Sequence, residues 1–74
     1  MDVIVGKKYK HFKGHICKVL NIAKDSEDLK EVVVYEHIDS GDVWVRPLSE
    51  FISDVDKNKY PDVMQEKRFM PLDD

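Results

Sequence analysis

Six side chains in this sequence could together recognise a ligand, because they combine aromatic rings with histidine and cationic groups. They occur in three short segments, at residues 9–13, 34–35 and 44–46. Alternate side chains of a β-strand point to the same face. The spacing therefore predicts one binding surface with six members: Tyr9, His11, Lys13, Tyr35, Trp44 and Arg46. Such a surface stacks planar groups and pairs with anions, and one cation–π contact contributes about 0.5–2 kcal/mol.

The position of Trp44 decides how large this surface is. If Val43 and Val45 pack into the core, alternation turns Trp44 and Arg46 toward solvent. The alternative is that Trp44 is the largest core residue and that Arg46 covers its edge. A short chain has few large apolar side chains with which to fill a core, which favours the alternative.

The other reactive residues form no recognisable catalytic or metal-binding pattern. His11, His15 and Cys17 have the spacing His-x3-His-x-Cys, which straddles a turn and matches no familiar zinc site, and His37 lies far along the chain. Cys17 is expected to be a small buried thiol, with a histidine-activated nucleophile as the alternative. No nucleophile-elbow motif surrounds a serine, and the three glycines stand apart. We therefore expect no enzyme activity, no metal and no cofactor.

Strands must position most of these side chains, because apolar and polar residues alternate with period two along much of the chain. Five strands are predicted, over residues 3–12, 15–24, 31–37, 43–46 and 66–70. Gly14 and Gly41 mark turns between them, since glycine adopts positive φ without a steric penalty. In the second strand, Ile16, Leu20 and Ile22 are expected to share one apolar side.

The pattern changes after Pro47. One apolar stripe recurs at helical spacing, formed by Leu48, Phe51, Ile52 and Val55, and it predicts a short helical turn near residues 48–53. Five short strands and one helical turn predict a mainly β domain, with a small five-stranded SH3-like barrel as the expected architecture. An open OB-like sheet is the alternative.

Length and composition point to one folded domain. The chain has 74 residues, of which 42% are hydrophobic and 36% charged, so a single domain is expected over 1–74 with its compact part at about 3–70. There is no apolar run long enough for a transmembrane helix and no signal-peptide pattern at the N-terminus. With one cysteine, which cannot form an internal disulfide, these features predict a cytoplasmic protein without a membrane partner.

Charge is distributed unevenly along the chain. Residues 1–24 contain six lysines and one aspartate, a balance of +5, whereas residues 25–66 contain twelve acids and four bases, a balance of −8. The lysines could lie on solvated strand edges or form an anion-binding face. The acidic remainder argues against tight binding of nucleic acid irrespective of sequence.

These observations favour a non-catalytic binding or accessory module. Alternatives are a protein–protein adaptor or structural homodimer, and a binder of nucleic acid or of an anionic ligand through the aromatic and basic face. The expected oligomeric state is a monomer or a weak homodimer.

Two motifs carry a family resemblance: Tyr-x-His-Phe-Lys-Gly at residues 9–14 and Trp-Val-Arg-Pro at 44–47. Together with Val-Val-Tyr at 33–35, Phe51 and Arg-Phe at 68–69, they make the chain resemble the small bacterial family catalogued as domain of unknown function 1653. The resemblance implies a bacterial origin and a small β-barrel classed with SH3-type folds. It implies no activity, because the family has none assigned.

Overall fold

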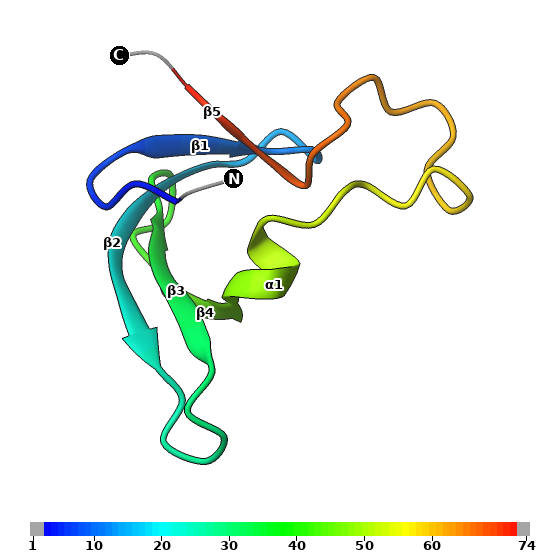
Figure 1. The fold of residues 1–74 in the computed structure, drawn as a ribbon. Helices are drawn as coiled ribbons and strands as arrows, with labels where there is room; N and C mark the ends of the chain where they lie inside the picture. Colours follow the sequence, from blue (N-terminus) through cyan, green and yellow to red (C-terminus); the bar gives the residue numbers. More distant parts are fainter. Residues whose placement is uncertain (1–2, 73–74) are drawn as a thin grey trace.

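Five strands form a single antiparallel sheet (Figure 1). The computed structural model describes residues 3–72, and its strands within that range are β1 (Lys8–His11), β2 (Ile16–Lys24), β3 (Glu31–His37), β4 (Val43–Pro47) and β5 (Phe69–Pro71). Their order across the sheet is β4-β3-β2-β1-β5, which leaves β4 and β5 at its edges. The prediction of a mainly β, five-stranded domain is confirmed.

The sheet is strongly bent, and the long strand β2 runs through the bend (Figure 1). A β-bulge at Leu20 interrupts the pairing of β2 with β3 and reverses the alternation of side chains beyond it. Cys17 and Val19 before the bulge face the concave side, and so does Ile22 after it, which lies opposite a buried valine of β3. The prediction that Ile22 shares a side with Ile16 and Leu20 is wrong, because it assumed unbroken alternation.

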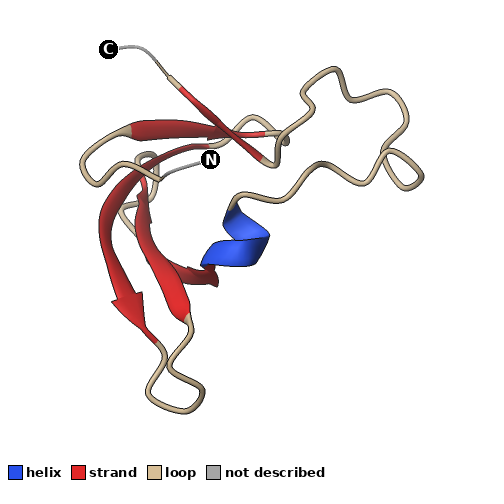
Figure 2. Cartoon of the chain, viewed as in Figure 1, coloured by secondary structure: helices blue, strands red, loops and turns tan. Residues whose placement is uncertain are grey.

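A single helical turn, α1 (Leu48–Phe51), follows β4 directly and lies inside the bend of the sheet (Figure 2). This confirms the short helix that was predicted near residues 48–53. The fixed φ of Pro47, −53°, suits the residue that leads into a helix. Within residues 3–72, no helix has the length and apolar character needed to cross a bilayer.

The core is a cluster of aromatic rings between the concave face of the sheet and α1. Phe51 and Phe69 stack with their ring centroids 4.0 Å apart, and Tyr9 and Tyr35 each meet Phe51 edge-on at about 5.5 Å. Aromatic pairs in these geometries contribute about 0.5–1.5 kcal/mol each beyond their area burial. Cys17, Val19 and Val33 complete the cluster. These rings fill the space that the sequence alternative assigned to Trp44.

The first and last strands begin later than predicted. Gly6, at φ 89°, lies in a turn that ends the extended backbone before β1. Ahead of β5, Val55 pairs with Glu66 and Arg68 with Ser53 through backbone hydrogen bonds of 2.7 and 2.9 Å. This pairing closes the base of the long loop seen in Figure 1, and the backbone N–H of Phe12 donates to the carbonyl of Arg68 at 3.0 Å, which holds Arg68 beside the end of β1.

Candidate functional site

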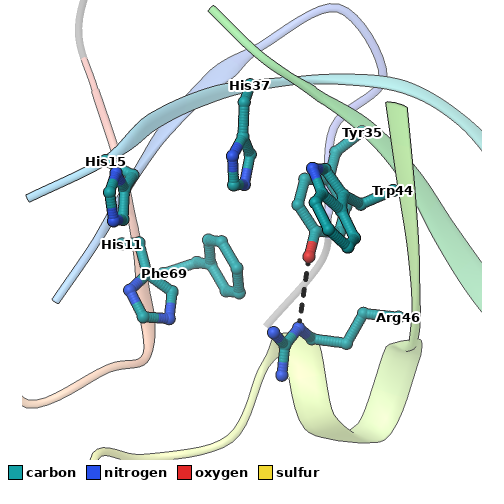
Figure 3. A pocket seen from close by; sticks show the side chains of 7 residues that line it. All are labelled: His11, His15, Tyr35, His37, Trp44, Arg46 and Phe69. Atoms are coloured by element: carbon teal, nitrogen blue, oxygen red, sulfur yellow. Dashed lines mark hydrogen bonds between the residues drawn. The ribbon is translucent and has the colours of Figure 1, made fainter. Parts of the chain in front are cut away.

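A cavity of about 230 Å³ opens on the concave face of the sheet, beside the aromatic core (Figure 3). Seven side chains line it: His11, His15, Tyr35, His37, Trp44, Arg46 and Phe69. They come from β1, the β1–β2 turn, β3, β4 and β5, so the cavity depends on the whole sheet. We call it the aromatic–histidine pocket.

The register of the sheet brings these residues together. Trp44 lies opposite Tyr35, Arg46 opposite Val33, and His11 opposite Phe69. Residues directly opposite one another on neighbouring strands share a face. Because Val33 and Tyr35 are buried on the concave side, Trp44 and Arg46 must lie on that side as well.

This register overturns the predicted orientation of β4. Val43 and Val45 were expected to pack into the core, but they lie on the outer face and are 57% and 61% exposed. Trp44 was expected either to face away from the core or to fill it, and it does neither. It lies on the core-side face of an edge strand, 49% exposed, and forms a wall of the pocket.

Tyr9 belongs to the core rather than to the binding surface. Its side chain is 1% exposed, and its hydroxyl accepts a hydrogen bond from the backbone N–H of Ile4 at 3.0 Å. The prediction that Tyr9 contacts a ligand at the surface is wrong. Tyr9 and His11 do share a face of β1, but Tyr9 lies deeper in the bend, where Phe51 covers it.

Arg46 is oriented by neutral groups. Its Nε donates a hydrogen bond to the Tyr35 hydroxyl at 3.4 Å, and its guanidinium lies 5.7 Å from the centre of the Phe69 ring (Figure 3). Within residues 3–72 an ion pair forms between Lys67 and Asp54, and Arg46 forms none. Its positive charge is therefore free to meet an anion.

Three histidines form the opposite wall (Figure 3). The rings of His15 and His37 are stacked, with centroids 5.7 Å apart, and His37 is equally far from Trp44. His11 lies edge-on to Phe69 at 4.9 Å. No three His, Cys, Asp or Glu side chains of the described range are placed to hold a metal ion together.

The surroundings of His11 favour its neutral form at pH 7. The backbone N–H of Lys13 donates to its Nδ1 at 3.1 Å, which requires that nitrogen to be unprotonated. Burial is the largest cause that lowers the pKa of His11, from 6.5 to about 4, and Arg46, Arg68, His15 and Lys13 lower it further through their charge. A positive field of this kind favours a bound anion.

Lys13 lies outside the aromatic–histidine pocket, in the turn between β1 and β2. It lines a second cavity of about 320 Å³, which shares His11 and Arg46 with the pocket. The full lining of this cavity is His11, Phe12, Lys13, Arg46, Asp56, Lys59, Tyr60 and Arg68. We call it the basic cavity.

Cys17 is fully buried on the concave face of β2. Desolvation raises the pKa of its thiol to about 11, although a backbone hydrogen bond from Tyr9 acts in the opposite direction. Since the thiolate is the nucleophilic form, this thiol is poorly reactive at neutral pH.

Of the six predicted site residues, the structure brings Tyr35, Trp44, Arg46 and His11 together in one pocket. The prediction omitted His15, His37 and Phe69. His37 could have been found, because it is two residues from Tyr35 in one strand and therefore shares its face. His15 could also have been found, because it follows His11 across one hairpin turn, where its carbonyl accepts a hydrogen bond from the His11 N–H at 2.7 Å. Phe69 depends on the pairing of β1 with the distant strand β5, which no local pattern encodes.

Comparison with known proteins gives one match. A family model described as "Protein of unknown function (DUF1653)" matches residues 7–71, a range that contains every residue of both cavities. Neither the curated proteins nor the solved structures gave a match.

Proposed function

This chain belongs to the DUF1653 family, and we propose that it is a non-catalytic binding module that takes up its ligand in the aromatic–histidine pocket. One observation carries the proposal. Side chains from four strands and a turn converge on one open cavity, and they include aromatic rings, imidazoles and an arginine without an ionic partner in the described range. Concave sites with an apolar lining and a few convergent polar groups are typical ligand sites.

The lining favours a ligand that is planar and negatively charged. Trp44 offers a half-exposed ring on which a planar group can stack, and Arg46 can donate to a carboxylate or phosphate. A cationic ligand is disfavoured, because Arg46 lies in the same cavity and would repel it.

Two features support a binding rather than a catalytic role. The pocket lining contains no serine, cysteine, lysine or carboxylate, which leaves its histidines and Tyr35 as the nucleophiles available there. The one thiol, Cys17, is buried and has a raised pKa.

We further propose that the sheet is an SH3-like barrel and that the protein is bacterial and cytoplasmic. The strand order β4-β3-β2-β1-β5, the bent β2 and the helical turn after β4 support the first assignment. The family resemblance supports a bacterial origin, and a single unpaired cysteine suits a reducing compartment.

Trp44 provides a direct test, because it is the sole tryptophan of the sequence and its emission reports on this pocket. The protein is titrated at low salt with benzoate, indole-3-acetate and phenyl phosphate. We expect a saturable change in Trp44 emission that is at least tenfold weaker in Arg46→Gln. Lys30→Gln, in the hairpin remote from the pocket, is the matched charge control. No saturable change with any probe, or equal binding by Arg46→Gln, would overturn the proposal.

A second candidate function is self-association or protein binding through β4. This strand lies at an edge of the sheet, and its outer face exposes Val43 and Val45, a combination that can template pairing with another chain. Sedimentation velocity over a hundredfold concentration range tests it. We expect a concentration-dependent dimer that Val45→Lys abolishes, and a strict monomer at all concentrations would exclude self-association.

A further inference from the structure

We propose that the aromatic–histidine pocket and the basic cavity form one bipartite site for a free nucleotide, whose base stacks at Trp44 and whose phosphate lies between Arg46 and Arg68. The inference rests on the proposed binding function, and it adds the class of ligand. The two cavities adjoin and differ in polarity, and their cations have no ionic partners within residues 3–72.

The two cavities adjoin, because His11 and Arg46 line both of them. Small-molecule sites usually have volumes of about 300–1,000 Å³. Taken alone, the pocket at about 230 Å³ is too small for this range and the basic cavity at about 320 Å³ barely reaches it. The combined volume of the two cavities lies well inside this range.

The two cavities also differ in polarity. The pocket is lined by rings and by one permanently charged side chain, Arg46. The basic cavity adds Lys13, Lys59 and Arg68, against a single carboxylate, that of Asp56. A ligand that fits both halves carries a planar ring at one end and a strong anion at the other. A nucleotide has this form.

The cations of the basic cavity are held in place without ionic partners. Arg68 donates from Nε to the Ser53 hydroxyl at 3.0 Å, and the ammonium groups of Lys13 and Lys59 lie 5.6 and 5.5 Å from the centre of the Tyr60 ring. None of these groups forms an ion pair in the described part of the chain. Guanidinium groups match the geometry of phosphate oxygens and can donate two hydrogen bonds at once.

The carboxylate in the basic cavity is committed to its own loop. Oδ1 of Asp56 accepts hydrogen bonds from the backbone N–H groups of Asn58 and Lys59, at 3.0 and 3.4 Å. It therefore fixes the loop that carries Lys59, and within residues 3–72 it forms no ion pair with Arg46 or Arg68.

His11 marks the boundary between the two halves. Arg46, Arg68 and Lys13 add to burial in lowering its pKa to about 4. A phosphate beside these groups would offset their charge and so raise the pKa of His11. Its titration is therefore an independent reporter of anion binding.

The charge of the rest of the chain limits the ligand to a single nucleotide unit. Residues 25–66 carry a balance of −8, and the whole chain carries −3. A nucleic-acid strand carries one negative charge per nucleotide and is repelled by a chain of negative net charge, whereas a free nucleotide brings a single phosphate group to the cations of the two cavities.

The experiment compares four probes by Trp44 fluorescence and calorimetry: adenosine, inorganic phosphate, AMP and an octanucleotide of adenylate. We expect AMP to bind at least tenfold more tightly than adenosine. Arg68→Gln should bring AMP affinity most of the way down to that of adenosine, because Arg46 still contacts the phosphate, and should leave adenosine binding unchanged, and Arg68→Lys should restore part of the difference. Saturating AMP should raise the midpoint of the His11 titration, followed by NMR, by about one pH unit or more.

The outcomes separate this inference from the proposed function. Equal affinity for AMP and adenosine, or an unchanged AMP affinity in Arg68→Gln, would overturn the bipartite site. If benzoate binds in the pocket but neither adenosine nor AMP does, the bipartite nucleotide site is overturned. The proposed binding function of the aromatic–histidine pocket would still hold. Tighter binding of the octanucleotide than of AMP would overturn the assignment to a free nucleotide. Failure of every aromatic probe would overturn both proposals.

Discussion

Two aromatic clusters lie side by side on the concave face of one sheet, and they differ in what covers them. Tyr9 and Phe51 are sealed between the sheet and α1, whereas Trp44 stands half exposed at the edge strand β4. Tyr35 and Phe69 belong to both clusters. A ring that other rings and α1 enclose loses more contact with water than one at the edge, so we expect it to stabilise the fold more. Stability and binding should therefore depend on different members of the same surface.

The strongest test of this contrast is Phe51→Ala. Phe51 stacks on Phe69 and meets Tyr9 and Tyr35 edge-on, so its removal opens a cavity at the centre of the core cluster. We expect a loss of about 3–5 kcal/mol in the free energy of unfolding. Because a chain of this size has little stability in reserve, the variant should be largely unfolded at 25 °C by circular dichroism.

Phe12→Ala is the matched control for Phe51→Ala. Phe12 is only partly buried and packs on Tyr60 and His11 at the rim of the basic cavity. Its removal should cost clearly less, about 1–2 kcal/mol in urea unfolding. If both variants lost the same free energy of unfolding, enclosure of a ring by α1 and the core would not determine how much that ring stabilises the fold.

The second test concerns the polar wall of the pocket, and it uses pH. The pKa of His11 is 6.5 in the unfolded chain and about 4 in the folded protein. Between these values the unfolded chain binds more protons, so the contribution of His11 to stability is fully present above pH 6.5 and is lost as the pH falls toward 4. Because His11 is only partly buried, solvent screens part of this effect, and the expected loss is about 1–2 kcal/mol.

Urea unfolding at pH 7, 5.5 and 4.5 measures this effect, and His11→Gln isolates it. The variant retains polarity but cannot titrate, so its stability should fall less over this range than that of the native protein. Parallel pH dependence in the two proteins would show that His11 is not the group responsible.

The same contrast explains which features the sequence could predict. The strand over residues 31–37, the turns at Gly14 and Gly41, and the helical turn after Pro47 each follow from local chemistry, and the structure contains all of them. The helix prediction also identified Phe51 as part of its buried stripe.

The site was harder to predict, because it depends on relations between segments. The bulge at Leu20 changes which face of β2 is apolar, and only the pairing with β3 reveals it. The orientation of Trp44 follows from its position opposite Tyr35, not from the valines on either side of it. Tyr9 and His11 share a face of β1, yet depth in the bend makes one a core residue and the other a pocket residue.

Trp44→Leu is expected to have the smallest effect on stability. It also tests most directly whether the half-exposed ring of Trp44 differs in role from the enclosed ring of Phe51. Trp44 is 49% exposed, and its ring lies at the rim of the pocket beside Tyr35 and 5.7 Å from the ring of His37. Its replacement should change the free energy of unfolding by less than about 1 kcal/mol, as is usual for exposed positions. Ligand binding, followed by calorimetry or by the NMR signals of His11, should nevertheless weaken at least tenfold, because the stacking surface is gone.

Phe51 and Trp44 would then form a reciprocal pair: one substitution removes the fold, and the other removes binding while the fold remains. A loss of more than about 2 kcal/mol in Trp44→Leu would place Trp44 energetically in the core, despite its exposure. In that case the pocket would be a by-product of packing at the end of a small sheet. A stable Trp44→Leu variant that no longer binds would instead mean that this edge of the sheet keeps a large ring in solvent for the sake of a ligand.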